Sequence, residues 1–322
     1  MTGATNQEVD RGRDARSPSE IPVTGWKDIG WRVFREIGED RITLIAAGVT
    51  FYLLLALFPA LAAFVSLYGL VSDPVTVADH IAYLGGLLPP TAIEIVQQQL
   101  QALVSERSQS LGLGFLIGLA IALWSANNGI KALFEAMNVA YDETEKRGFI
   151  KLNLLSLSFT LATLVLGIML IIAVGVVPAV LAILGLSPWA ETLIAFARWP
   201  TLLLVSMFGI LMLYRFGPSR ERPKWRWLSW GAVIATLVWL AASVAFSYYL
   251  QNFADYDATY GSLGAIIGLM MWTWISVVVL IVGAEIDAEI EHQTARDTTT
   301  GPPEPMGRRG AVVADTVGDP VD

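Results

Sequence analysis

The stretch that decides the fold is GSLGAIIGLMMWTWISVVVLIVGAEIDAEIE, residues 261–291. It runs from Ser262 to Ala284 without a charged side chain, and about 20 such residues suffice for a helix to cross the hydrocarbon core of a membrane. The chain then places an acid at every second position: Glu285, Asp287, Glu289 and Glu291. A helix this apolar indicates a membrane protein, and its acidic end requires an explanation.

The same apolar character recurs along the whole chain. Of its 322 residues, 54% are hydrophobic and 16% are charged, with a mean hydropathy of +0.56, whereas a soluble domain carries about a quarter charged residues. Backbone groups in lipid must be satisfied internally, so the spanning segments have to be helices. We therefore predict an all-α polytopic membrane protein with six transmembrane helices, near residues 43–72, 111–130, 154–183, 200–216, 228–251 and 262–284.

The distribution of Lys and Arg predicts the topology. There are 7 before the first span, then 1, 4, 1, 5 and 0 in the successive loops, with Arg215 at the end of the fourth span counted in the loop that follows it, and 3 after the last span. Because cytoplasmic loops carry the excess of basic residues, both termini are expected on the cytoplasmic side of the membrane. The loops 131–153 and 217–227 are expected on the same side. Residues 1–25 and 293–322 are polar and are expected to be unstructured tails that flank a membrane domain at 26–292.

Two segments outside the spans have the periodicity of interfacial amphipathic helices. Trp26, Ile29, Val33 and Ile37 share one face of a helix that is expected to lie on the inner leaflet, with a solvated linker helix as the alternative. Residues 91–107 repeat the pattern in an outer loop. This second helix is expected to cover protein or lipid, with a lid role as the alternative.

The sequence lacks the side chains that common catalytic and metal sites need. It contains no Cys, and its two histidines, His80 and His292, fall on opposite sides of the predicted membrane. It has no nucleotide-binding loop and no nucleophile motif. We therefore expect no catalytic residue, no metal, no cofactor and no enzymatic activity.

Polar residues at membrane boundaries are the candidates for a transport path, because they are costly there. Asn127 and Asn128 either join helices or line a pathway, and Asp255 and Asp257 either attract cations to an outer entrance or form a solvated turn. The pathway candidates are Tyr52, Asn127, Asn128, Lys131, Arg215, Asp255, Asp257 and Glu285. The loop RFGPSRERPKWRW suits anionic lipid headgroups through Arg220, Arg222, Lys224 and Arg226, although topology alone also explains these charges.

The acids at the end of the last span conflict with the negative end of the helix dipole. Water is expected to solvate Asp287, Glu289 and Glu291. Glu285 follows Gly283 and Ala284, small residues that let another helix approach, so it is expected to face the bundle. There it would pair with Arg215 or Lys131, and the pair would either close the inner end of a transport path or lock helices together.

Three stretches carry a resemblance to a known family: AAGVTFYLLLALFPAL, WSANNGIKALFEAMNVAYDETEKRGFIKLNLL and YGSLGAIIGLMMWTWISVVVLIVGAEIDAEIE. Residues 30–291 are similar to the YihY/BrkB family of bacterial inner-membrane proteins. The resemblance implies a six-helix membrane protein and brings conflicting labels, ribonuclease BN and virulence factor BrkB. Clustered His and Asp ligands for a zinc nuclease are absent from the sequence.

Three functions follow from these observations. The first expectation is a transporter or flippase-like protein for a lipid, an osmolyte or an ion, with Pro59 and Pro178 or Pro200 as breaks in helices around a central site. The alternative is a non-transporting scaffold for envelope integrity or serum resistance, and a membrane ribonuclease comes last. The expected partners are membrane lipids and a small-molecule, lipid or ion substrate, without nucleic acid.

Overall fold

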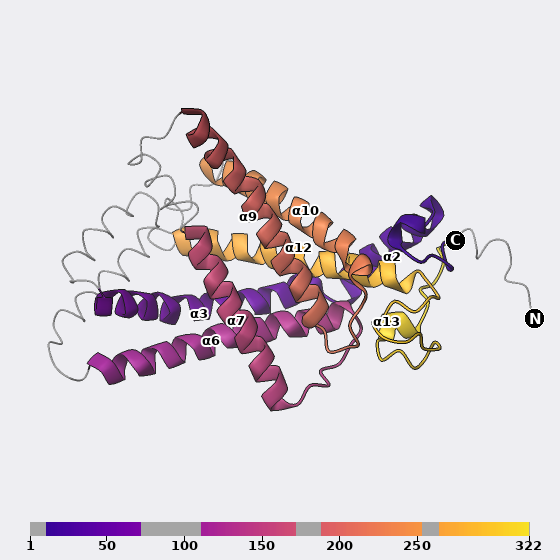
Figure 1. Ribbon diagram of the computed structural model, residues 1–322, viewed down its shortest axis with the longest axis horizontal. Coiled ribbons are helices and arrows are strands. Elements are labelled where there is room, and N and C mark those ends of the chain that lie inside the picture. Colours follow the sequence, from indigo (N-terminus) through magenta and orange to yellow (C-terminus); the bar gives the residue numbers. More distant parts are fainter. Residues whose placement is uncertain (1–10, 72–110, 172–187, 253–263, 322) are drawn as a thin grey trace, which may run out of the picture. The chain divides into compact units, whose positions relative to one another are not determined.

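The computed structural model describes residues 11–71, 111–171, 188–252 and 264–321, and among these residues it contains helices and no strand (Figure 1). The fold class is all-α, as predicted. An isolated antiparallel bridge joins Pro223 to Thr299. In chain order the helices are η1 (Pro18–Glu20), α2 (Val23–Glu39), α3 (Ile42–Val71), α6 (Leu111–Ala140), α7 (Phe149–Ile171), α9 (Pro188–Phe216), α10 (Trp225–Asn252), α12 (Gly264–His292) and α13 (Val312–Asp315).

The chain forms two compact units, each assembled from separate stretches of sequence. The first unit comprises Met1–Ile45, Leu133–Leu240 and Val278–Asp322, and the second comprises Ala46–Ala132 and Ala241–Val277. Helices α3, α6, α10 and α12 each contribute to both units. Both chain-terminal segments belong to the first unit.

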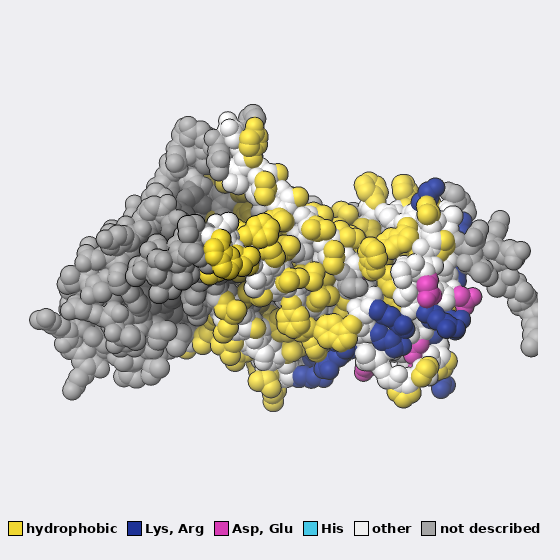
Figure 2. Space-filling view, turned by 45° about the horizontal axis from the view of Figure 1, so that its top comes forward, with side chains coloured by type: hydrophobic (Ala, Val, Ile, Leu, Met, Phe, Trp, Pro, Cys, Tyr) yellow, Lys and Arg dark blue, Asp and Glu magenta, His cyan; other side chains and the backbone are white. Residues whose placement is uncertain are grey.

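Four helical stretches of the described chain are long and apolar enough to cross a membrane: Phe149–Leu166, Thr192–Phe216, Trp225–Leu250 and Ile266–His292. Their outer faces carry exposed large apolar side chains such as Leu161, Phe208 and Leu237, and hydrophobic side chains cover much of the visible helical surface in Figure 2. Apolar faces this extensive suit contact with lipid. The two remaining predicted spans fall on α3 and α6, and six membrane crossings stay a prediction.

Two of the prolines predicted to break helices do not do so. Helix α3 continues through Pro59, and α9 continues through Pro200. The third, Pro178, lies outside the described residues. A membrane helix tolerates an internal proline where neighbouring helices, Ser or Thr side chains or local changes in helix geometry satisfy the backbone groups that the proline frees.

Helices α10 and α12 approach closely at small residues. A Cβ added to Gly231 of α10 would lie 2.2 Å from the carbonyl oxygen of Gly283 in α12. A Cβ on Gly283 would lie 2.6 Å from Ala235 Cβ and 2.3 Å from the hydroxyl oxygen of Tyr214. That hydroxyl donates a 2.7 Å hydrogen bond to the Leu280 carbonyl. The close helix contact predicted beside Glu285 is therefore present.

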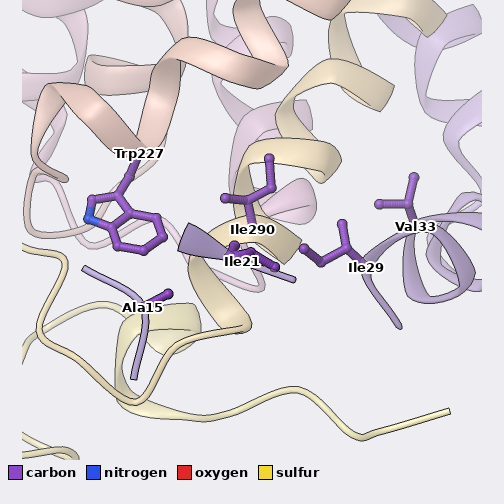
Figure 3. Close-up of a cluster of buried hydrophobic side chains, with 6 residues drawn as sticks. All are labelled: Ala15, Ile21, Ile29, Val33, Trp227 and Ile290. Atoms are coloured by element: carbon purple, nitrogen blue, oxygen red, sulfur yellow. The ribbon is translucent and has the colours of Figure 1, made fainter. Parts of the chain in front are cut away.

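The apolar face of α2 packs against protein, where the sequence predicted a membrane surface or solvent. Ile29 and Val33 join a buried cluster with Trp227 of α10, Ile290 of α12 and Ile21, as the close-up in Figure 3 shows. Trp26 and Ile37 pack against the same cluster. The periodicity identified the buried face correctly, but it carries no information about which surface covers that face.

Residues 293–321 pack against the helices and do not form the unstructured tail that their polar composition predicted. The Ala295 N–H donates to the Arg13 carbonyl at 2.8 Å, and the Gly318 N–H donates to the His292 carbonyl at 2.9 Å. Figure 1 shows this segment, in yellow, beside the end of α12. Its backbone hydrogen bonds, its buried threonines and buried apolar residues such as Val313 stabilise it, although its composition is mostly polar.

Candidate functional site

The charged groups of the first unit gather at the ends of α2 and α12, the start of α10, the loops 141–148 and 217–224, and residues 293–321. We call this region the polar end. Its segments touch one another: the Lys146 N–H donates to the Ser219 hydroxyl at 2.9 Å, and the Val312 N–H donates to Glu143 Oε1 at 2.8 Å. These are the segments that the Lys and Arg distribution assigned to one side of the membrane.

All four acids at the end of α12 are buried in the polar end. Their exposed fractions are 2% for Glu285, 1% for Asp287, 6% for Glu289 and 1% for Glu291. The prediction that water solvates the last three was therefore wrong. Helix α2 and residues 293–321 fold over the end of α12 and exclude water from it.

Three of the four acids have a basic side chain or a backbone N–H as a partner. Glu289 forms a buried ion pair with Arg32 of α2, and Glu291 forms one with Arg220 and also accepts a hydrogen bond from the Thr298 hydroxyl. Asp287 Oδ1 accepts a 2.7 Å hydrogen bond from the Gly231 N–H. Such partners are what a buried carboxylate needs, since an unpaired charge in an apolar interior is very costly.

Glu285 faces the bundle as predicted, but its partner is a different one. Its carboxyl group is hydrogen-bonded to the carboxyl group of Asp40, which caps the end of α2. The two predicted cations have other contacts: the Arg215 guanidinium donates to the Pro223 carbonyl at 2.6 Å, and the Lys131 ammonium lies 5.4 Å from the centre of the Trp124 ring. The partner of Glu285 is therefore an acid, Asp40, and not one of the two predicted bases.

A basic pocket of about 800 Å³ opens beside the buried acids. It lies between the start of α7, the end of α9 and the loop 217–224, and Thr300 and Gly310 of the C-terminal segment complete its wall. The apolar side chains of Leu154, Leu155 and Phe216 form part of the lining. Its basic residues are Lys146, Arg147, Lys151, Arg215, Arg220 and Arg222, against the single acid Glu221.

Three of these six basic residues form ion pairs with carboxylates of the protein. Lys146 pairs with Glu143 at 2.6 Å, Arg147 pairs with Glu145 at 2.6 Å, and Arg220 pairs with Glu291. Burial alone would raise the pKa of the Glu145 carboxyl, but hydrogen bonds from Arg147 outweigh it and lower that pKa to about 2. These three bases shape the pocket and leave little charge for a ligand.

The other three bases form no ion pair within the described part of the chain. Lys151 is exposed on the first turn of α7. The guanidinium carbons of Arg215 and Arg222 lie 5.9 Å and 4.9 Å from the centre of the Phe216 ring, close enough for the two charges to act on each other. Two guanidinium groups near one ring, neither in an ion pair within the described chain, make this part of the pocket a candidate site for an anion.

The C-terminal segment holds the pocket loop in place. The Thr300 N–H donates to the Arg222 carbonyl at 2.8 Å, and the Lys224 N–H donates to the Thr298 carbonyl at 2.9 Å. The Glu221 N–H donates to the Gly310 carbonyl at 3.1 Å. This pairing fixes the backbone that carries Arg222.

The remaining predicted site residues lie elsewhere. In the second unit, Tyr52 is exposed on α3, while Asn127 is buried and Asn128 and Lys131 are partly buried on α6. Lys224 and Arg226 lie outside the pocket lining, whereas the headgroup candidates Arg220 and Arg222 belong to it. Asp255 and Asp257 lie outside the described residues. The structure therefore brings together Arg215, Arg220 and Arg222.

Sequence reasoning missed Lys146, Arg147 and Lys151 as members of this pocket. The signal for them was the count of four basic residues in the loop 131–153, which was used for topology alone. Asp40 was missed too. Its contact with Glu285 joins residues 245 positions apart, which no local pattern reveals.

Comparisons with known proteins agree on the class of protein. The family model described as virulence factor BrkB matches residues 33–307. The ribonuclease-like protein YfkH of Bacillus subtilis is 34% identical over 76% of this chain and 88% of its own length. A UPF0761 membrane protein of Tolumonas auensis is 26% identical over 83% of this chain and 87% of its own length. No solved structure matches the chain.

Proposed function

This chain belongs to the virulence factor BrkB family of membrane proteins, and on that premise we propose that it is a transporter of the flippase type for anionic phospholipids. The basic pocket would hold the lipid headgroup at the inner leaflet, on the side where the polar end would lie. The observation that carries the proposal is the pair Arg215 and Arg222 beside Phe216, which no carboxylate compensates within the described chain.

The lining of the pocket favours an amphiphile over a free ion. Leu154, Leu155 and Ser158 of the lining belong to the stretch Phe149–Leu166, which is long and apolar enough to cross a membrane. The arginines lie at the end of the neighbouring stretch Thr192–Phe216 and in the loop after it. Basic pockets between membrane helices bind acidic lipid headgroups, whose acyl chains then lie along the apolar surface.

The binding step is tested by neutralising the two arginines. In nanodiscs of phosphatidylcholine with added phosphatidylglycerol, Arg215→Gln/Arg222→Gln is expected to bind phosphatidylglycerol at least about tenfold more weakly than the parent protein. Each charged hydrogen bond contributes about 1.5–3 kcal/mol, and about 1.4 kcal/mol is a factor of ten. Lipid-dependent thermal stabilisation and native mass spectrometry measure the change.

The matched control is Lys224→Gln/Arg226→Gln, which removes the same charge from the same part of the chain but outside the pocket lining. It is expected to bind phosphatidylglycerol within about twofold of the parent, since a general surface charge is largely screened by salt. Equal losses in both double variants would refute a specific pocket. Inorganic phosphate, added alone, tests whether the site takes a free anion.

The transport step needs its own measurement. Proteoliposomes with labelled phosphatidylglycerol and an impermeant quencher are expected to show lipid crossing that Arg215→Gln/Arg222→Gln abolishes. Binding without any crossing would favour the scaffold function for envelope integrity, and it would leave the pocket itself intact. The term ribonuclease-like belongs to the name of the Bacillus subtilis relative YfkH, and we do not extend that activity to this chain.

A further inference from the structure

At the polar end the carboxyl groups of Glu285 and Asp40 contact each other, although a buried acid ordinarily pairs with a base. Glu285 is almost fully buried on α12, and Asp40 is half-buried at the end of α2, next to Arg41, whose φ of 52° turns the chain into α3. The two side chains are hydrogen-bonded to each other. Glu285 Oε1 has no hydrogen-bond partner within the described chain.

The surroundings of the pair are mostly acidic, and the nearby bases Arg32, Arg35 and His292 already contact other acids. The Arg35 guanidinium lies 3.1 Å from Glu36 and 3.7 Å from Glu39. Arg32 and His292 both contact Glu289. Neither Asp40 nor Glu285 forms an ion pair with any residue that the structure describes. The charged and titratable groups around the pair are Arg35, Glu36, Glu39 and Arg41 from α2 and its turn, Asp142 from the loop after α6, and Glu289 and His292 from α12.

Two ionised carboxylates cannot be hydrogen-bonded to each other, because neither has a proton to donate. We propose that Asp40 and Glu285 share one proton and together form a proton-binding site at the polar end. One carboxyl donates its O–H to the other, so the pair carries a single negative charge. Buried acid pairs elsewhere hold a proton in the same way. Burial also raises the pKa of the Asp40 carboxyl above its ordinary value.

The different burial of the two acids gives the site a direction. Asp40 reaches the surface, whereas Glu285 lies inside the helical contact and keeps one oxygen without a partner. A proton enters from solvent at Asp40 and passes to Glu285 along their hydrogen bond. The site does not depend on the basic pocket or on the proposed lipid substrate, since none of its residues lines that pocket.

Infrared spectroscopy of the full chain in nanodiscs tests the shared proton. At neutral pH the parent protein is expected to show the C=O band of a protonated carboxyl group, because the two adjoining carboxyl groups share one proton. Glu285→Gln is expected to abolish this band, and Asp40→Asn is expected to shift its frequency because the partner of the shared proton is lost. The control Glu39→Gln, at a side chain that is 61% exposed, is expected to leave the band unchanged.

Three results would overturn the proposal, and two of them need no variant. The first is the absence of a protonated carboxyl band from the parent protein at neutral pH. The second is loss of the band at constant pH when sodium or potassium ions are added, which would show that the pair binds a metal cation. Survival of the band in folded Glu285→Gln would assign it to another acid. Thermal unfolding of each variant establishes that it is folded.

Discussion

Gly231→Ala is expected to lower the free energy of unfolding by about 3 kcal/mol, the upper end of the usual cost of overpacking. The new methyl group would lie 2.2 Å from the Gly283 carbonyl oxygen and 2.5 Å from the Asp287 carboxyl carbon. The carbonyl belongs to the backbone, so α10 and α12 must separate to make room. That movement also weakens the 2.7 Å hydrogen bond from the Gly231 N–H to Asp287.

Thermal or denaturant unfolding of the purified protein measures this change. The matched control is Gly209→Ala in α9, where an added Cβ would meet no atom within 4 Å. Alanine is a better helix former than glycine by about 0.8–1 kcal/mol, so the control is expected to be neutral or slightly stabilising. Similar destabilisation at both positions would show that the contact of α10 with α12 is not as close as the structure has it.

The sequence predicted this contact because its cause is local. Gly283 and Ala284 are small, and small residues let helix backbones approach, whatever the partner. The helical class and the buried face of α2 were predictable for the same reason, since apolar length and periodicity are properties of short stretches. The partner helix was not predictable, because α10 reaches Gly283 only through the tertiary fold.

The burial of the four acids of α12 could not be predicted from the sequence, because the basic residues that pair with them are distant along the chain. Arg32 and Glu289 are 257 positions apart, and Arg220 and Glu291 are 71 apart. Helix geometry and the dipole predicted only that these acids need partners. Without knowledge of the tertiary fold, water was the simplest partner to predict. Residues 293–321 exclude water because they pack against the end of α12.

The basic pocket was predictable in part. The composition of the loop 217–227 indicated anionic headgroups and placed Arg220 and Arg222 among the candidates. The structure distinguishes the two arginines by their partners. Arg220 forms an ion pair with Glu291, whereas Arg222 and Arg215 both lie near the Phe216 ring. A count of charges gives the sign of a surface, but the acids that fold onto it determine which charges remain for a ligand.

Arg32→Met is expected to destabilise the protein by about 3–5 kcal/mol, because it leaves the buried Glu289 carboxylate without its main partner. The two side chains are only 2% and 8% exposed. The Arg32 guanidinium also donates to Gln293 Oε1 at 2.8 Å and to the Asp319 carbonyl at 3.1 Å. The same substitution therefore releases the C-terminal segment, and limited proteolysis is expected to cut that segment faster.

Arg35→Met is the control for this prediction, since it lies three residues further along the same helix with a side chain that is 45% exposed. Its ion pairs face solvent and contribute at most about 1 kcal/mol. The double variant Arg32→Met/Glu289→Met is expected to recover most of the loss in stability, because two apolar side chains replace a buried pair at little cost. Equal effects of Arg32→Met and Arg35→Met, or a double variant less stable than Arg32→Met, would contradict a buried ion pair as the contact that holds α2 to α12.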